Sequence, residues 1–276
     1  MQRFEFSAQV TPQEQGKLID FLAVKTSVSR VKLKEAMIKG AVWRSKAGKT
    51  LRVRRATTEI VAGERIKLYY DETLLALEPP TVTCIADEQK YSLWYKPAGL
   101  LTQGSEYGDH YSLERIVAQR SEQRPVFLVH RLDREAEGLV MLAHNKIAAA
   151  HFSNLLVTHA IEKRYRVMVL GDIAAQGERG MLEMPLDGKS ARTDYAVVDY
   201  CTETRRTRLD VWPRTGRFHQ IRRHFAAVGH PVIGDPRYGC GNKEVSGLKL
   251  AAVGLQFTCP FTHRQRQFDV TGHLNW

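Results

Sequence analysis

The chain is poor in cysteine and contains no long apolar segment. Its 276 residues include four cysteines, and no two of them stand at the spacing of a metal-binding pair: Cys84, Cys201, Cys240 and Cys259. This scatter argues against a zinc site or a disulfide framework and indicates isolated reduced thiols. No apolar run approaches the roughly 20 residues of a membrane helix, and the first residues show no secretory h-region. We therefore expect a cytoplasmic protein that does not cross a membrane.

Acidic residues are scarce relative to basic ones, and the imbalance is uneven along the chain. Lys and Arg number 41 against 30 Asp and Glu, a formal net charge of +11. Residues 1–71 hold 15 of the basic and 7 of the acidic residues, so most of the excess lies in the first quarter. A concentrated basic segment indicates a polyanionic partner, most simply nucleic acid, although a solvated basic face would look the same.

Residues 1–71 have the pattern of a small α/β module. A threonine followed by proline at Thr11-Pro12 predicts the start of a helix that carries the apolar residues of 18–22. A second helix is expected over residues 29–40. Short β-prone runs then predict strands at residues 41–43, 51–53 and 65–70. Two helices and a few strands in so short a segment indicate one compact module.

The second of these helices has a basic exposed face. Arg30 and Lys34 stand one turn apart, and like charges at that spacing repel mildly unless a polyanion neutralises them. The module resembles the S4 RNA-binding domain in Leu18–Leu22, Ser29-Arg30, Gly40 and Gly63-Glu64-Arg65-Ile66. It departs from that domain at Arg44-Ser45-Lys46, where Asn-Gly is usual. The resemblance implies that Arg30 and Lys34 hold structured RNA through phosphate contacts.

A proline-rich segment follows the module. Residues 72–81 end in Glu78-Pro79-Pro80 and are expected to form a linker, because proline removes the backbone donors that a sheet requires. Residues 82–276 then form a second domain. Its apolar and alternating runs predict strands at 91–95, 126–129, 139–143, 161–170, 191–200 and 208–211, with helices at 113–119, 145–155 and 216–225.

The most polar stretch next to an expected core strand is residues 130–138, His-Arg-Leu-Asp-Arg-Glu-Ala-Glu-Gly. Asp133 stands there between Arg131 and Arg134, and the apolar run 139–143 follows at once. Burying such charge is costly unless it is paired. From the local sequence alone, a structural ion pair and a functional carboxylate are equally good interpretations.

Several spaced motifs of the second domain, in this order, resemble those of the RluA-type pseudouridine synthases. They are Lys96-Pro97 with Gly99-Leu100; His130-Arg131-Leu132-Asp133 with Gly138; Lys163 with Tyr165; and Thr215-Gly216-Arg217 with His219-Gln220-Ile221-Arg222 and His224. Gly229, Pro231, Gly234-Asp235 and Tyr238-Gly239 complete the series. The resemblance implies an α+β fold with a mixed, mainly antiparallel central sheet and flanking helices, preceded by the small α/β module.

The resemblance also implies an isomerase that converts uridine to pseudouridine in RNA with neither metal nor other cofactor. Asp133 would be the catalytic aspartate, Tyr165 the active-site tyrosine and Arg222 the partner of Asp133. The further residues expected to contact RNA are Lys96, Arg131, Arg134, Arg217, His219 and Gln220. The reaction breaks a glycosidic C–N bond, turns the uracil and rejoins it through C5.

General chemistry is consistent with these roles. A carboxylate can act as a nucleophile at the base or the sugar, or it can abstract a ribose proton, and the sequence leaves these routes open. An arginine partner favours the charged form of a buried carboxylate, and we expect Arg222 to be a bidentate partner of Asp133. Tyr165 offers a flat face to an extruded uracil, and such stacking is worth about 1–3 kcal/mol per base.

Three positions depart from the family pattern. Ala136-Glu137 stands where Thr-Ser is usual, Tyr95 replaces the Asn before Lys-Pro, and Leu250-Ala251-Ala252 replaces Leu-His-Ala. A second carboxylate near Asp133 would raise the pKa of one of the two if both faced inward. We expect Glu137 to face Arg134 or solvent instead.

Three further hypotheses compete with an rRNA-modifying enzyme. Ribosomal RNA is favoured over tRNA because an S4-like module suits large structured RNA, and tRNA is the alternative. The departures at Ala136-Glu137 also permit a catalytically silent RNA-binding or ribosome-assembly factor. A glycoside hydrolase would need paired carboxylates, for which Asp133 and Glu137 are the only candidates. The chain is expected to be a monomer.

Overall fold

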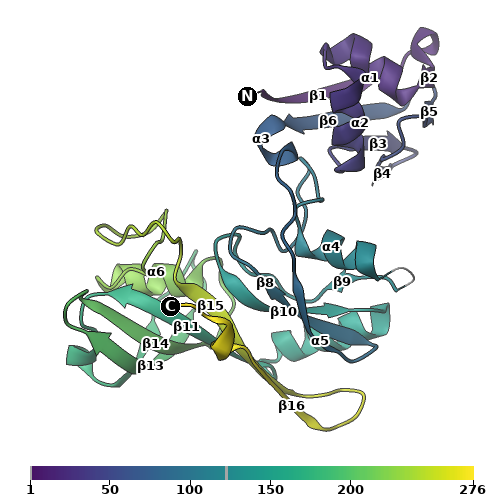
Figure 1. Ribbon diagram of the computed structural model, residues 1–276. Coiled ribbons are helices and arrows are strands. Elements are labelled where there is room, and N and C mark those ends of the chain that lie inside the picture. Colours follow the sequence, from purple (N-terminus) through teal and green to yellow (C-terminus); the bar gives the residue numbers. More distant parts are fainter. Residues whose placement is uncertain (1, 122–123) are drawn as a thin grey trace. The chain divides into compact units, whose positions relative to one another are not determined.

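The computed structural model describes residues 2–121 and 124–276, and its contacts divide the chain into two units (Figure 1). The first unit comprises Met1–Pro80 with Gln103–Arg120, and the second comprises Thr81–Thr102 with Ser121–Trp276. The first unit therefore includes a segment, residues 103–120, that follows a strand of the second unit in the sequence. Among the described residues, no helix has the length and apolar character needed to cross a membrane.

The first unit is built on a four-stranded antiparallel sheet in the order β1-β6-β3-β4. Its main elements are β1 (Arg3–Gln9), α1 (Leu18–Thr26), α2 (Arg30–Ile38), β3 (Val42–Lys46), β4 (Lys49–Arg52) and β6 (Arg65–Asp71). The smaller ones are η1 (Pro12–Glu14), β2 (Gly16–Lys17), β5 (Glu59–Ile60), α3 (Glu72–Leu75) and α4 (Leu113–Arg120). The helix expected from Thr11 begins only at Leu18, because residues 16–17 are extended and pair with β5.

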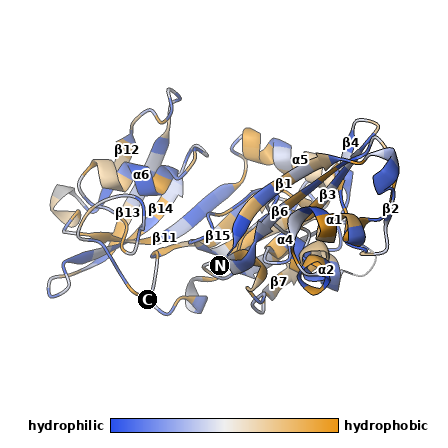
Figure 2. Cartoon of the chain, turned by 90° about the horizontal axis from the view of Figure 1, so that it is seen from above, coloured by the Kyte–Doolittle hydropathy of each residue, from blue (hydrophilic) through white to orange (hydrophobic). Residues whose placement is uncertain are grey.

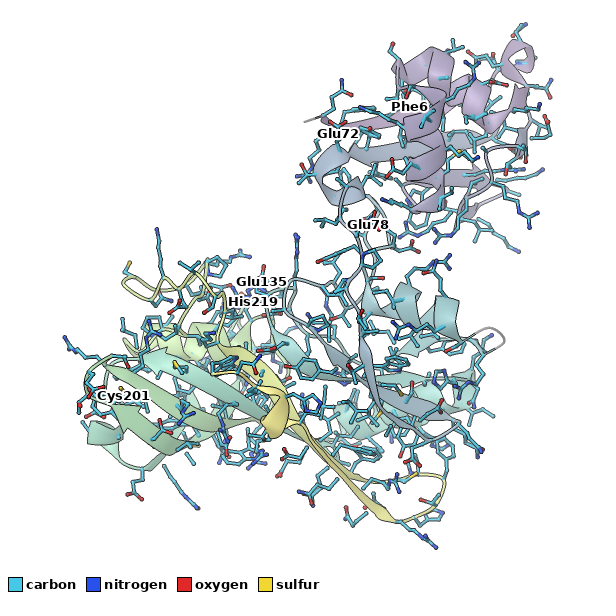
Figure 3. The ribbon with its side chains drawn as sticks, in the orientation of Figure 1. Phe6, Glu72, Glu78, Glu135, Cys201 and His219 are labelled. Atoms are coloured by element: carbon cyan, nitrogen blue, oxygen red, sulfur yellow. The ribbon has the colours of Figure 1, made fainter. Side chains whose placement is uncertain are left out.

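Both α1 and α2 cover one face of this sheet (Figure 1). Strand β6 shows why the helices pack on this face. Its residues Ile66, Leu68 and Tyr70 are buried, while the residues between them, which point to the opposite face, are more exposed. Phe6, labelled in Figure 3, packs its ring against Phe21 of α1, and α1 is largely hydrophobic in Figure 2. The opposite face of the sheet is left to polar side chains.

The second unit contains a ten-stranded sheet. Eight strands follow the order β12-β13-β14-β11-β15-β10-β8-β7, with β16 paired to β15 and β9 to β10. Its strands are β7 (Thr83–Asp87), β8 (Tyr91–Lys96), β9 (Phe127–Leu128), β10 (Glu137–Ala143), β11 (Glu162–Leu170), β12 (Arg179–Glu183), β13 (Arg192–Cys201), β14 (Arg206–Pro213), β15 (Leu250–Thr258) and β16 (Gln265–Asp269). Its helices are α5 (Lys146–Val157), η2 (Ala174–Gln176), α6 (Gln220–Ala227) and η3 (Thr271–His273).

Within this sheet, only the pair β10–β15 is parallel among the described residues, and every other pair is antiparallel. The predicted α+β class with a mixed, mainly antiparallel sheet is thereby confirmed.

Strand β10 fixes the position of the polar stretch before it. All five residues of 139–143 are fully buried, as expected for a central strand that is covered on both faces. Gly138 has a φ of +112°, and a Cβ there would collide with the backbone of Ala252 on β15. Glycine is therefore required where the polar loop enters the sheet. The loop that carries Asp133 is anchored directly to the core.

Candidate active site

The carboxylate of Asp133 borders a cavity of about 230 Å³ in the second unit. The walls come from the loop 131–136, the start of β11, and the turn 213–219 with the first residues of α6. Half of the lining residues are charged or aromatic, and these side chains are Arg131, Asp133, Lys163, Tyr165, Arg217, Phe218, His219 and Arg222. The fold thus brings motifs from distant parts of the sequence to one site.

Arg222 connects two carboxylates in this site. It is 1% exposed, and its Nη1 donates to Oδ2 of Asp133 at 3.0 Å. Its Nε and Nη2 donate to the two oxygens of Asp235 at 2.7 and 2.8 Å. The bidentate partner of Arg222 is therefore Asp235, and the expectation of a bidentate pair with Asp133 is wrong. Asp133 receives one of the five N–H groups because the planar fork is already directed at Asp235.

The electrostatics of this cluster favour ion pairs. Burial acts to lower the pKa of Arg222, but the hydrogen bonds to Asp235 and Asp133 outweigh it and hold that pKa above its usual value. Burial acts to raise the pKa of Asp235, yet Arg222 and the backbone N–H groups of Arg237 and Tyr238 keep it below its usual range. Arg222 is therefore positively charged in this site, and Asp235 holds its guanidinium in place.

His219 lies beside Asp133 at the start of α6. Its Nε2 is 3.5 Å from Oδ2 of Asp133, and its Nδ1 is 3.1 Å from the Tyr238 hydroxyl. Burial lowers the pKa of His219, Arg222 lowers it further, and Asp133 opposes the shift. Figure 3 labels His219 next to Glu135, whose carboxylate lies 3.6 Å from Nη1 of Arg222. A neutral imidazole at this position can donate one hydrogen bond and accept one.

Tyr165 comes to the cavity from β11. The register of β11 against β15 shifts between Arg164 and Tyr165, so a bulge falls at the residue that lines the cavity. Burial raises the pKa of the Tyr165 phenol, and the charge of Asp133 raises it further. The phenol is therefore protonated at neutral pH, and its ring is available as a stacking surface.

Lys96, predicted as an RNA contact, is 0% exposed and does not line the cavity. Its Nζ donates to the carbonyl oxygens of Pro97, Leu100 and Arg134 at 3.0, 2.8 and 3.2 Å. Burial lowers the pKa of Lys96 to about 7 against the opposing charge of Glu135. Its three acceptors match the three donors of an ammonium group. In this geometry Lys96 holds the polar loop to the turn after β8.

A threonine and an arginine hold the same loop. Thr102, which is 3% exposed, donates through Oγ1 to the Leu132 carbonyl and accepts from the Leu132 N–H, at 2.8 and 3.1 Å. Arg134 donates through Nε to the Gly99 carbonyl at 3.1 Å, and its own carbonyl accepts from the Gly99 N–H at 2.8 Å. The residues on both sides of Asp133 are therefore fixed by hydrogen bonds.

Glu137 faces neither Arg134 nor solvent, so that expectation is wrong. Its Oε2 accepts from the Tyr95 hydroxyl at 2.6 Å, and its Oε1 accepts from Nε1 of Trp276 at 2.8 Å. The Tyr95 ring also stacks on His273, with the ring centroids 5.4 Å apart. Two of the three departures from the family pattern, Tyr95 and Glu137, are therefore hydrogen-bonded to each other on neighbouring strands.

Comparison with known proteins places these motifs in one family. The model of the RNA pseudouridylate synthase family matches residues 90–227, half of the chain. The chain belongs to this family. It is similar to the dual-specificity RNA pseudouridine synthase RluA of Vibrio parahaemolyticus, with 31% identity over 71% of this chain and 87% of that protein.

Two further comparisons agree with membership of the pseudouridylate synthase family. The ribosomal large subunit pseudouridine synthase C of Vibrio cholerae is 27% identical over 82% of this chain and 76% of its own. The solved structure of human RNA pseudouridylate synthase domain containing 1 has a TM-score of 0.58 at 22% identity and covers 70% of this chain and 86% of that chain. The latter supports the synthase fold alone.

Of the remaining residues predicted to contact RNA in this synthase, some line the cavity and others lie on the first unit. Arg131 is exposed at the cavity, and Arg217 lines it while donating to the Ser190 carbonyl at 3.1 Å. Gln220 is 4% exposed, and its amide bonds to Thr215, Arg217, Arg192 and Thr193. Gln220 therefore shapes the turn before α6. Arg30 and Lys34 lie exposed on α2 of the first unit.

Sequence reasoning missed several members of the site. Asp235 belongs to the Gly234-Asp235 motif, but the sequence indicates no role for it, although a fully buried arginine is better stabilised by a second, buried carboxylate when its other partner is partly exposed. Phe218 is 56% exposed and stacks on His219 with centroids 3.7 Å apart. Tyr238 contacts His219, and no local pattern signals that contact. Among the described residues, no three or more His, Cys, Asp or Glu side chains gather as metal ligands.

The half-buried His130 is expected to make the folded synthase sensitive to acid. Its Nε2 accepts the N–H of Met141 at 3.1 Å, and burial lowers its pKa from 6.5 to about 4. Between these values the unfolded chain binds a proton that the native state does not. We expect the titration of His130 to lower the free energy of unfolding by about 3 kcal/mol as the pH falls from 6.5 to 4. Below pH 4 it should cause no further loss.

Urea unfolding of the wild type and His130→Gln across this pH range measures the effect. Glutamine keeps an acceptor for the N–H of Met141 but does not titrate. The free energy of unfolding should therefore fall less in the variant than in the wild type as the pH is lowered. Parallel pH profiles for the two proteins would contradict the prediction.

Proposed function

We propose that this RNA pseudouridine synthase, an isomerase of uridine in RNA, acts on ribosomal RNA. In the proposed site Asp133 is the catalytic carboxylate, Tyr165 stacks on the target base and Arg222 positions Asp133. One observation carries the proposal: the Asp133 carboxylate borders a base-sized cavity, 3.0 Å from a buried guanidinium. A pocket of this kind accepts a base taken out of its helix.

The contacts of Asp133 support a direct role in the reaction. Its side chain is 25% exposed, whereas that of Asp235 is 0% exposed on the other side of Arg222. Asp235 therefore satisfies the buried guanidinium, which leaves Asp133 accessible from the cavity. Asp133 attacks the base or sugar, or abstracts a ribose proton. Each route can use Oδ1, because Oδ2 is the oxygen that accepts from Arg222.

The protonated Tyr165 and the cations at the cavity edge complete the proposed site. Tyr165 stacks on the extruded uracil, which offsets part of the cost of unstacking it from the RNA. Arg131, Arg217 and Lys163 line the cavity and meet the flanking phosphates.

Ribosomal RNA is proposed as the substrate because the first unit is rich in basic residues and its sequence resembles the S4 RNA-binding domain. A relative named for the ribosomal large subunit agrees with this choice, and tRNA is the alternative. We further propose that the protein acts as a monomer in the cytoplasm.

Mapping pseudouridines in RNA tests the proposal. Cells lacking the protein should lose modification at one or a few rRNA positions, and expression of the wild type should restore them. Loss confined to tRNA would replace the rRNA proposal with the alternative. An unchanged map across both RNA classes would contradict the enzymatic role and favour a silent RNA-binding or assembly factor.

A further inference from the structure

The sheet of the first unit has a polar face opposite α1 and α2. The strand registers arrange its side chains in two rows across the four strands. The first row is Ser7, Lys67, Trp43 and Arg52, and the second is Gln9, Arg65, Ser45 and Thr50. We call these eight residues the open face.

One end of the open face is occupied by the segment 105–109 of the same unit. The indole N–H of Trp43 donates to the Glu106 carbonyl at 2.9 Å, and Nη2 of Arg52 donates to the Ser105 carbonyl at 2.7 Å. Arg52 also lies 3.6 Å from the carboxylate of Asp109. Trp43 and Arg52 are therefore engaged within the unit.

The other end of the open face retains uncompensated charge. Arg65 is exposed and Lys67 half-buried on the central strand β6, and within the described part of the chain neither has a carboxylate at ion-pair distance. Arg65 lies between Gln9 and Ser45 in its row, and Lys67 lies between Ser7 and Trp43. Three of these four neighbours are therefore hydroxyls or an amide. Such groups donate hydrogen bonds to phosphate oxygens.

The basic face of α2 differs, because carboxylates lie beside most of its cations. Arg30 pairs with Asp20 at 2.9 Å, and Lys32 pairs with Glu72 at 2.7 Å. Lys39 pairs with Glu35 and Glu78. Each exposed pair stabilises the fold little, but together four carboxylates offset the positive field that would attract a polyanion.

We propose that the open face, through Arg65 and Lys67, binds the phosphate backbone of the RNA substrate. The proposal rests on the proposed function and names a substrate surface on the first unit, whereas the cavity with Asp133 belongs to the second. Residues two apart on a strand lie about 7 Å from each other on the same face, so the two cations can meet neighbouring phosphates of one strand. The hydroxyls and amide of the rows supply the hydrogen bonds around them.

Binding of a fluorescein-labelled oligouridylate to the full-length protein, measured by anisotropy over a salt series, tests the surface. The Arg65→Gln/Lys67→Gln variant should bind about tenfold more weakly at low salt, with a salt slope smaller by about 1.4, as expected for two lost phosphate contacts to a single strand. The matched control is Lys17→Gln/Arg55→Gln, which removes the same charge from exposed positions outside the open face. It should bind within about twofold of the wild type.

A third variant, Arg30→Gln/Lys34→Gln, tests α2 as the competing surface. A loss larger than that of the open-face variant would overturn the proposal, as would equal losses in the open-face and control variants. Circular dichroism of each variant separates lost binding from lost folding. Because the assay measures binding without turnover, a protein that binds through this face but makes no pseudouridine would contradict the proposed function alone.

Discussion

Replacement of Asp133 by asparagine is expected to reduce pseudouridine formation by at least about 10² to 10⁴ fold, the range associated with a positioned acid–base group. Asparagine keeps the size of the side chain and can still accept the hydrogen bond from Nη1 of Arg222, which in the wild type spans 3.0 Å. It cannot act as a nucleophile or as a base. Tritium release from C5-labelled RNA measures the loss.

Asp187→Asn is a matched control for this substitution. Asp187 is an exposed aspartate of the same unit that pairs with Arg223 at 2.9 Å and does not line the cavity. Its variant should react at about the wild-type rate. Activity retained in Asp133→Asn would remove Asp133 from the chemistry. Complementation of an assembly defect by Asp133→Asn would further show that such a defect does not depend on catalysis.

Replacement of Arg222 by methionine is expected to destabilise the second unit by about 3–5 kcal/mol and to abolish activity. The substitution leaves the carboxylate of Asp235, whose side chain is 0% exposed, without its bidentate partner. Breaking one side of a buried ion pair typically costs that much, because the other charge stays buried. Urea unfolding and the tritium assay measure the two effects.

A second substitution separates the loss of stability from the loss of activity. In Arg222→Met/Asp235→Asn neither buried charge remains, and the asparagine oxygen can still accept the backbone N–H groups of Arg237 and Tyr238, so much of the lost stability should return. Activity should not return, since Asp133 still lacks its guanidinium. If the double variant regained activity along with stability, Arg222 would be a structural residue only.

The sequence predicted those parts of the synthase that depend on local pattern. The apolar run 139–143 is the fully buried centre of the sheet, as its continuity indicated. Asp133, Tyr165 and Arg222 meet at one cavity because the family motifs specify the loop, the strand and the helix that carry them. Their catalytic roles are still predictions.

Contacts between distant residues could not be predicted in the same way. Whether Arg222 directs its fork at Asp133 or Asp235 depends on how α6 is rotated against the sheet, which periodicity does not reveal. The same holds for Glu137, whose partners Tyr95 and Trp276 are far away in sequence. Lys96 looked like a contact for RNA because charge suggests exposure, yet three backbone carbonyls enclose it.

We expect the charges around Arg222 to influence which part of a nucleotide can enter the cavity. Its guanidinium pairs with the carboxylates of Asp133, which lines the cavity, and of Asp235, which does not, whereas Arg131, Arg217 and Lys163 also line the cavity. Two like charges 4 Å apart repel by about 4 kcal/mol at an effective dielectric constant of about 20. We therefore expect a phosphate to be repelled by the Asp133 carboxylate and held by the lysine and arginines of the lining, while an uncharged uracil can enter. Such a cavity would discriminate by charge before any hydrogen bond to the base is formed.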